Sequence, residues 1–469
     1  MATYHLNAAD LITLLASTVT PGTEGAILQT LIQNGEFPGP VGSLQDVETV
    51  AGPPGLVPSQ SNVTIDAGTQ LELITIPTST PVTGSVFPAP TVGDTSPSAT
   101  FNFLSPGGVV IASGDQAVVV NDFNTDGVDT LVGGAGYERL VSQTASNVLM
   151  AGSGANTLIG GTGNDTLIGG GVSRLVAGTG NQMLVGGTMK GASDTLIGGS
   201  GADVLKVTMG DNRLVAGTGF NTLYGGSGND TLLGGGQSSL VAGTGDSTLK
   251  GGFSAGAQDT LIGGAGADRL MVTQGDNSLV AGSGMNTLLG GSGNDTLVGG
   301  GQARLVGQGG NTQLFASGQG GDTLIGAGGD DSLVGTNGGS RLVAYNGDDT
   351  LTGGSGHDTL VAGGPSNITM VGGTGDTRMV DVSGVNATVM GGSGSDTTVL
   401  GTKGDDSILG GTGDMKIVSQ QNSTDLVSNS STAVGGLHTL TFSDGQTIVV
   451  NDVNSNITIH FADGGVTPV

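Results

Sequence analysis

The chain of 469 residues contains no cysteine and no tryptophan, and only 3% of its residues are aromatic. Without cysteine it can form no disulfide, no cysteine-ligated zinc site and no reactive thiol. Large apolar side chains are too few for an ordinary globular core, which is packed densely from such residues. No run of about 18 apolar residues occurs, so the sequence predicts no membrane-spanning helix.

Basic residues are scarce as well: 12 Lys and Arg stand against 39 Asp and Glu, for a net charge of −27. Such a chain repels nucleic acids and anionic lipid surfaces, which argues against both as partners. Only five of the acids are Glu. The short side chain of Asp suits turns and sites for hard cations, so the acidic residues predict turns and cation sites.

The first residues carry no Lys or Arg ahead of their apolar stretch, so we expect no cleaved secretory leader. The protein then either stays in the cell or leaves by a route that keeps its N-terminus. Twelve of the fourteen prolines lie at or before Pro106, which sets the beginning of the chain apart from the rest. The segments that we expect are a helical N-terminal segment at 1–37 with helices over 7–17 and 23–33, an irregular β segment rich in Pro, Ser and Thr at 38–128 with a strand over 71–76, a repeat region at 129–429, and a β-rich C-terminal cap at 430–469 with strands over 437–442, 447–450 and 457–461.

Glycine is abundant: the chain has 94, about one residue in five against a usual ~7%. From Leu140 to Leu360 leucines recur mostly nine residues apart, each after a glycine-rich stretch, and Val389, Val399, Ile408 and Ile417 continue the pattern more weakly. A fixed short period of this kind predicts an all-β fold, a parallel β-roll or solenoid in which each Leu fills a narrow interior. The full motif Gly-Gly-x-Gly-x-Asp-x-Leu occupies 160–167, 198–205, 225–232, 263–270, 290–297 and 353–360.

A longer period is superimposed on the first. Nearly the same block begins at Gly160, Gly225 and Gly290, 65 residues apart, and each block holds seven short repeats. Because seven is odd, a two-sided roll places corresponding insertions of successive blocks, Met189–Gly191 and Ala255–Ala257, on opposite edges.

The motif has the chemistry of a calcium site. Glycine allows sharp turns with positive φ that present carbonyl oxygens inward. An Asp carboxylate adds to these, and two facing turns can supply the about six to eight oxygens that Ca²⁺ prefers. Stacked carboxylates repel without metal, so we expect folding to be coupled to calcium. The metal ligands that we expect are Asp165, Asp203, Asp230, Asp268, Asp295, Asp322, Asp331, Asp349, Asp358, Asp396 and Asp406, in turns that contain Gly160, Gly163, Gly225, Gly228, Gly290, Gly293 and Gly328.

This motif resembles the repeats-in-toxin, or hemolysin-type calcium-binding, nonapeptide over roughly residues 129–417. The resemblance implies a right-handed parallel β-roll with Ca²⁺ between successive turns. It also implies export by type I secretion machinery through an uncleaved C-terminal signal, and hence an extracellular or cell-surface location.

The turns nevertheless depart from a fully acidic ladder. On a two-sided roll Asp165 is followed along its edge by Gln182 and then Asp203, so acids alternate with neutral residues. Weaker calcium sites, or hydrogen-bonded Asn and Ser ladders without metal, are both compatible with this pattern. The best pair of acids is Asp331 with Asp349, 18 residues apart.

The position before each Leu is often Thr, which in a regular row can order water as an ice-binding face does, or simply suits a strand. Arg139, Arg213 and Arg269 can occupy the same column or an adjacent edge. The threonines concerned are Thr157, Thr166, Thr195, Thr222, Thr231, Thr260, Thr287 and Thr296.

No catalytic motif is present, and His357 is expected to be a solvated loop residue, so we expect no enzyme. The favoured hypothesis is a secreted calcium-binding structural protein that assembles head to tail with itself, through its terminal segments, into a filament or surface layer. The alternative is a monomeric secreted calcium-binding adhesin, or an ice-binding or matrix module.

Overall fold

The computed structural model describes residues 128–468 apart from 135, 255, 383, 385, 402, 432–435 and 452–455. Before residue 128 it describes only the strand segments 2–4, 47–51, 61–62, 71–75, 99–103, 108–113 and 118–122. The helices expected over 7–17 and 23–33 lie outside the described residues. The chain divides into two compact units, unit 1 at 1–236 and unit 2 at 237–469.

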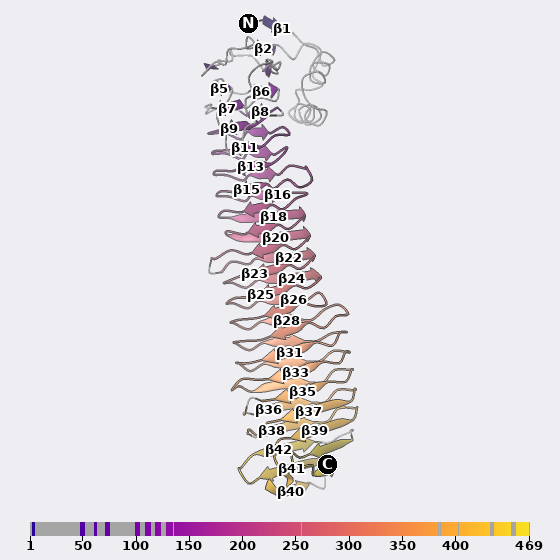
Figure 1. Cartoon of the computed structure of the whole chain (residues 1–469). Coiled ribbons are helices and arrows are strands. Elements are labelled where there is room, and N and C mark those ends of the chain that lie inside the picture. The colour runs from indigo at the N-terminus through magenta and orange to yellow at the C-terminus, as the bar shows by residue number, and fades with distance from the viewer. Residues whose placement is uncertain are drawn as a thin grey trace. The chain divides into compact units, whose positions relative to one another are not determined.

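Unit 1 consists of short strands. They are β1 (Ala2–Tyr4), β2 (Val47–Ala51), β3 (Ser61–Asn62), β4 (Leu71–Thr75), β5 (Ala99–Phe103), β6 (Gly108–Ser113), β7 (Val118–Asp122), β8 (Asp129–Val132), β9 (Glu138–Val141), β10 (Val148–Met150), β11 (Asn156–Ile159), β12 (Thr166–Ile168), β13 (Ser173–Val176), β14 (Met183–Val185), β15 (Thr195–Ile197), β16 (Val204–Lys206), β17 (Arg213–Val215), β18 (Phe220–Ser227) and β19 (Thr231–Leu233) (Figure 1).

Unit 2 is built in the same way. It contains β20 (Gln237–Thr244), β21 (Thr248–Lys250), β22 (Thr260–Ala265), β23 (Arg269–Met271), β24 (Ser278–Ser283), β25 (Thr287–Leu289), β26 (Thr296–Val298), β27 (Arg304–Val306), β28 (Gln313–Phe315), β29 (Thr323–Ile325), β30 (Ser332–Val334), β31 (Arg341–Ala344), β32 (Thr350–Thr352), β33 (Thr359–Ala362), β34 (Ile368–Val371), β35 (Arg378–Asp381), β36 (Ala387–Met390), β37 (Asp396–Leu400), β38 (Asp406–Leu409), β39 (Met415–Ser419), a 3₁₀ turn η1 (Ser423–Asp425), β40 (Leu426–Ser431), β41 (Leu437–Phe442), β42 (Thr447–Asn451), β43 (Ile457–His460) and β44 (Val466–Pro468).

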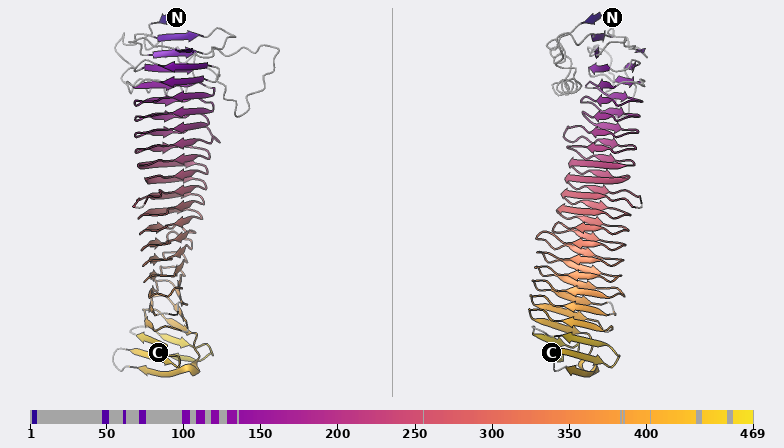
Figure 2. Two further views of the ribbon diagram at one scale, coloured as in Figure 1. Left: turned by 90° about the vertical axis from the view of Figure 1, so that its left-hand side faces the viewer. Right: turned by 180° about the vertical axis from the view of Figure 1, so that it is seen from behind.

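Each unit is a parallel β-solenoid, as the nine-residue period predicts. Even-numbered strands pair with even-numbered strands and odd with odd, so two successive repeats make one coil (Figure 2). In unit 1 Leu149 lies in register between Leu131 and Leu167. In unit 2 Leu279 lies in the same way between Leu261 and Leu297. These leucines are fully buried, and their columns form the core.

The predicted core position Val399 is wrong. The inward residue of β37 is Thr398, which aligns with Met379 on one side and Ile417 on the other. Coils in this region have 19 residues where most others have 18 or 17, so a count of nine from earlier repeats shifts by one. The strand alternation then turns Val399 outward, while Val389, Ile408 and Ile417 are buried as expected.

Parallel pairing also includes the described strands before residue 129. The strand expected over 71–76 is present as β4, which pairs in parallel with β2 and with β6. The next pairing, β6 with β8, joins this segment to the repeats. Only β1 is antiparallel to its neighbour, β2, among the described strands of this segment.

The C-terminal strands expected over 437–442, 447–450 and 457–461 are confirmed as β41, β42 and β43. β42 and β43 pair in parallel with β38 and β39, and so complete a last coil. β40 and β41 form an antiparallel hairpin beside β42, and β44 folds back antiparallel on β43. Phe442 and Phe461 pack edge to face beneath them, with ring centres 6.3 Å apart. None of the described helices is long and apolar enough to cross a membrane.

Candidate calcium-binding turns

The turns of the solenoid depend on glycine at the fourth position of the motif. Gly163, Gly228 and Gly293 have φ of 125°, 126° and 128°, a region that side chains with a Cβ rarely adopt. In the turn that contains Gly328, the positive φ of 92° belongs instead to its neighbour Gly329. Gly225 lies within β18.

The first and second glycines are required by close packing. A Cβ on Gly199 would lie 1.7 Å from the carbonyl oxygen of Gly178 in the preceding coil. A Cβ on Gly160 would lie 2.6 Å from Oδ2 of Asp165, and one on Gly290 would lie 2.8 Å from Oδ2 of Asp295. The carboxylate thus occupies the space that a side chain would fill, with turn carbonyls stacked beside it.

The sixth position of the motif forms a ladder inside each turn. In unit 1 the backbone N–H of Asn147 donates to Oδ1 of Asp165 (2.8 Å), that of Asp165 to Oε1 of Gln182 (2.9 Å), and that of Gln182 to Oδ1 of Asp203 (3.0 Å). This is the order of acid and amide expected from the sequence. One oxygen of each Asp in the ladder is therefore already engaged by a backbone N–H.

In unit 2 the expected pair of acids is brought together. The N–H of Asp331 donates to Oδ1 of Asp349 at 2.7 Å. At the exposed fifth position, the N–H of Asp348 donates to Oδ1 of Asp330 at 2.9 Å. Four carboxylates therefore lie in two adjacent turns. Other backbone N–H donors to Oδ1 of predicted ligands are Asn212 to Asp230, Ser247 to Asp268, Asn277 to Asp295, Ala303 to Asp322, Ser340 to Asp358, Thr377 to Asp396 and Ala387 to Asp406.

The second oxygen divides ten of the eleven predicted aspartate ligands into two classes. In the first class Oδ2 is buried and has no hydrogen-bond partner among the described residues. In the second class Oδ2 accepts a backbone N–H from its own turn, as in Asp203 from Gly199 (2.9 Å) and Asp358 from Gly354 (2.6 Å). Asp322 and Asp396 share the second arrangement. The first class comprises Asp165, Asp268, Asp295, Asp331, Asp349 and Asp406.

The free oxygens of the first class fit a calcium ion. A buried carboxylate oxygen without a donor costs free energy unless a cation or a proton satisfies it. No group of three or more His or acidic side chains gathers at one point in the described part of the chain, so backbone carbonyls must complete the coordination. Those carbonyls are the stacked turn oxygens that exclude a Cβ from the glycines.

Burial raises the pKa of several carboxyl groups in these turns. It raises the pKa to about 6 for Asp165, Asp295 and Asp331. For Asp349 burial is again the main cause, and the carboxylates of the neighbouring acids add to it, so the pKa rises to about 7. Without metal these groups therefore bind protons more readily than an exposed Asp.

At least four buried acids of the ladders were not among the predicted ligands, namely Asp129, Asp194, Asp259 and Glu138. Asp194 and Asp259 follow the turn insertions, and both of their oxygens accept backbone N–H groups. The tripeptide Asp-Thr-Leu that they begin also occurs at several predicted sites and could have identified them. Glu138 replaces Asp in the turn before β9, and burial raises its pKa to about 8.

A second, outer ladder runs through the exposed fifth position. The N–H of Asn181 donates to Oδ1 of Asn164, and the N–H of Ala202 donates to Oδ1 of Asn181, both at 2.8 Å. The fifth positions of these turns are therefore held by amide hydrogen bonds.

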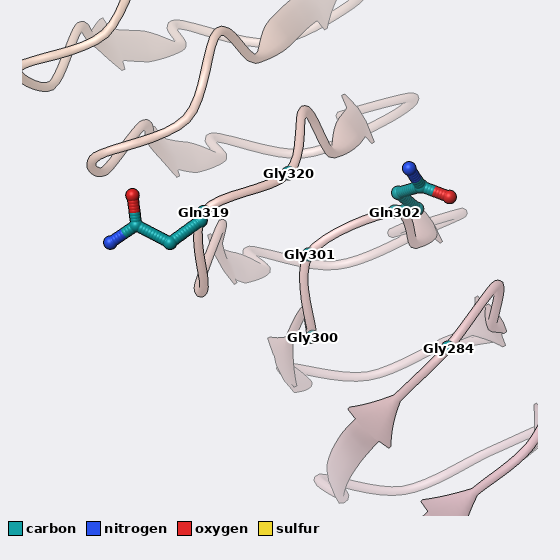
Figure 3. A pocket seen from close by; sticks show the side chains of 6 residues that line it. All are labelled: Gly284, Gly300, Gly301, Gln302, Gln319 and Gly320. Carbon is teal, nitrogen blue, oxygen red and sulfur yellow. The ribbon is translucent and has the colours of Figure 1, made fainter.

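Other features of the described surface lack such chemistry. An open depression of about 230 Å³ in unit 2 is lined by Gly284, Gly300, Gly301, Gln302, Gln319 and Gly320. The two glutamine side chains point away from each other (Figure 3). The side chain of His357 is 85% exposed, as expected for a loop residue, with Nδ1 3.7 Å from Oδ2 of Asp376.

Comparison with known families identifies the repeats. The model of the RTX calcium-binding nonapeptide repeat matches residues 143–173, 190–206, 208–239, 236–270, 271–306, 334–364 and 390–414. No curated protein matches the chain. The buried Asp carboxylates in glycine turns agree with the calcium binding of such repeats. The repeat region therefore belongs to the RTX calcium-binding nonapeptide repeat family, and the protein is a calcium-binding RTX β-roll protein.

Proposed function

We propose that this protein is a secreted structural subunit that assembles with itself into an extracellular filament or surface layer, stiffened by calcium. The repeat region takes up most of the chain, and the site that it carries binds calcium rather than a substrate. A subunit of such an assembly contacts its neighbours through its terminal segments. In this chain the terminal segments carry antiparallel strands, β1 and β40, which differ from the parallel strands of the repeats.

The observation that carries the proposal is the open edge of β40. Among the described strands β40 pairs on one side only, with β41. Five of its six residues are exposed, none is charged, and Val427 is 67% exposed. Soluble proteins normally guard such an edge with Lys, Pro or a bulge, because it accepts a strand from another chain. β40 has one such irregularity, between Leu426 and Ser428, but its regular part, Ser428–Ser431, carries no bulge, Lys or Pro.

A corresponding edge exists at the start of the chain. Among the described strands β1 pairs only with β2, and this pairing is antiparallel. The other edge of β1 therefore has no partner among them. If β40 of one copy pairs with the β1 edge of the next, the interface is heterologous. Heterologous contacts that do not close into a ring build open filaments.

Export is part of the same proposal. The resemblance to RTX proteins supports a type I route with an uncleaved C-terminal signal, which places the protein outside the cell. Calcium at the higher extracellular concentration then stabilises the turns after export, because only the folded turns offer the complete set of oxygens. We also propose that the protein is not an enzyme.

The test replaces Val427 by Lys, which places a charge on the exposed edge of β40. The matched control is Val466→Lys on β44, an edge residue that is 57% exposed and is followed by Pro468. In calcium, electron microscopy should show filaments or sheets for the wild type and for the control, and isolated particles for Val427→Lys. Isolated wild-type particles at high concentration would instead favour the monomeric adhesin or matrix module.

The ice-binding alternative has less support. The threonines before the inward leucines do not form an uninterrupted row, because they divide between the two sheets. On the odd-numbered strands Thr157 and Thr195 are separated by Arg174, and on the even-numbered strands Thr166 and Thr222 are separated by Met183 and Val204.

A further inference from the structure

The outer face of the odd-numbered strands collects all seven arginines of the chain. Each occupies the outward position just before the inward Leu or Met, and each is exposed. We call them the arginine row of their unit. The row of unit 1 consists of Arg139 on β9, Arg174 on β13 and Arg213 on β17, and the row of unit 2 consists of Arg269 on β23, Arg304 on β27, Arg341 on β31 and Arg378 on β35.

Within each row the arginines are regularly spaced. Every second strand carries Thr at the same position, so that in unit 2 Thr323 lies in register between Arg304 and Arg341. Neighbouring strands of a sheet are ~4.8 Å apart, so successive arginine positions recur about every 9.5 Å. The intervening Thr keeps like charges from lying directly opposite each other.

Among the residues that the structure describes, no acid forms an ion pair with these arginines. Apart from Arg and Thr, the outward positions of the odd-numbered strands from β9 to β39 are Val, Ile, Leu or Met, with Lys250 and Lys416, and none is acidic. The ion pair found in the described part of the chain joins His357 to Asp376 and involves no arginine. A face of positive charge is thus maintained on a protein of net charge −27.

The internal duplication shows that the face, and not the position in the repeat, determines where Arg occurs. Because a block contains seven repeats, a residue on an odd-numbered strand corresponds, 65 positions later, to one on an even-numbered strand. Arg139 thus corresponds to Val204 on β16 and then to Arg269 on β23. Equivalent positions carry Arg only where they face outward from odd-numbered strands.

A second set of equivalent positions follows the same rule. Arg174 on β13 corresponds to Ser239 on β20 and then to Arg304 on β27. Arg213 on β17 corresponds to Ser278 on β24. Simple copying of a block would place Arg on both faces, and the even-numbered strands have lost it or never acquired it.

We propose that the arginine rows bind a linear anionic polysaccharide whose carboxylates recur at intervals separated by neutral sugars. The planar guanidinium group binds a carboxylate through two parallel hydrogen bonds, which suits it to this role. Binding at this face is compatible with the acidic composition, because repulsion from distant carboxylates is screened beyond about 8 Å at physiological ionic strength.

The other polyanionic occupants match the rows less well. Duplex nucleic acid carries one charge per about 1.7 Å, far more than the rows can pair. A second copy of the chain offers exposed acids at the wrong intervals, since Asp276, Asp330 and Asp348 on one edge of unit 2 are three coils and then one coil apart.

The test measures binding of the full-length protein to hyaluronan, in which glucuronate alternates with a neutral sugar, by interferometry in calcium at physiological ionic strength, where the distant carboxylates are screened. Dextran serves as the neutral control polysaccharide. The variant Arg304→Thr/Arg341→Thr introduces the residue already present on the intervening strands, so it should fold normally. Its melting temperature in calcium checks this.

A relocation variant provides the matched control. In the background of the double variant, Gln313→Arg and Thr350→Arg place two arginines at the same two-coil spacing on the even-numbered strands β28 and β32. Net charge then equals that of the wild type, and only the face differs.

The wild type should bind hyaluronan and not dextran, and its affinity should fall as salt rises. The double variant should bind about five- to tenfold more weakly, since two exposed ion pairs are lost. The relocation variant should remain weak. The proposal is overturned if the wild type does not bind hyaluronan, if relocation restores binding, or if single-stranded DNA binds as tightly. It is overturned equally if sedimentation without polysaccharide shows wild-type association that the double variant abolishes, because a second copy is then the occupant.

Discussion

At the scale of single residues, the Asp at the sixth position of the motif occurs in two arrangements. In one, both carboxylate oxygens accept backbone N–H groups, and in the other only one does. Asp358 gives both oxygens to backbone N–H groups and stabilises the turn by itself. Asp331 and Asp349 give only one, and the other oxygen stays buried and free for a cation. The same residue type in the sequence therefore marks a turn residue at one place and a candidate metal ligand at another.

This difference predicts opposite effects of the same substitution. Asp331→Asn/Asp349→Asn removes two buried charges, so in chelator this variant should melt at a higher temperature than the wild type, and calcium should raise its melting temperature less. Asp358→Asn/Asp396→Asn instead sets an amide NH₂ against a backbone N–H. This should cost about 1–3 kcal/mol per site in chelator. Differential scanning fluorimetry with and without calcium checks both, and equal shifts for the two variants would contradict the division into classes.

At the scale of the coil, strand register decides which residue faces inward, whatever its chemical type. Thr398 is fully buried in a column of Met379 and Ile417, and its hydroxyl has no hydrogen-bond partner among the described residues. A hydroxyl buried without a partner destabilises the folded state.

Thr398→Val keeps the shape of the side chain and removes the hydroxyl, so it should raise the free energy of unfolding by about 1 kcal/mol. The matched control is Thr397→Val on the same strand, whose side chain faces outward and should change little. Chemical denaturation in calcium measures both variants. A loss of stability in Thr398→Val would mean that the hydroxyl is satisfied in solution.

The period of nine predicted the coils, the inward leucines and the order of Asp165, Gln182 and Asp203 along one edge, because strand register follows directly from residue count. It failed at Val399, where the coils lengthen by one residue and counting no longer gives the face. Which Asp oxygens remain free could not be predicted either, since this depends on whether a turn N–H, such as that of Gly354, comes within hydrogen-bond distance.

At the scale of the whole molecule, the buried carboxylates act together on stability. In the metal-free protein several have a folded pKa of about 6 to 7, against ~3.9 for Asp in an unfolded chain. The folded state therefore holds more protons between these values. The contribution of these carboxyl groups to the free energy of unfolding is therefore greatest below about pH 4. It is lost as the pH rises through about 6 to 7.

Calcium should reverse this dependence, because it binds the ionised carboxylates that protons would neutralise. In chelator the protein should melt at a higher temperature at pH 5 than at pH 7.5. In millimolar calcium the melting temperature should rise, and the rise should be larger at pH 7.5. Thermal melts under the four conditions measure this, and a melt that chelator leaves unchanged at pH 7.5 would mean that hydrogen-bonded ladders alone hold the turns.

The odd number of repeats in a 65-residue block limits how this molecule can grow. Inserting one more block would move every later repeat from one sheet of the roll to the other, so that a patterned flank would switch sides at the insertion. Inserting blocks in pairs would leave each flank where it was. Lengthening by recombination is thus neutral only in even steps, which gives anyone who builds longer versions a simple rule for keeping both flanks intact.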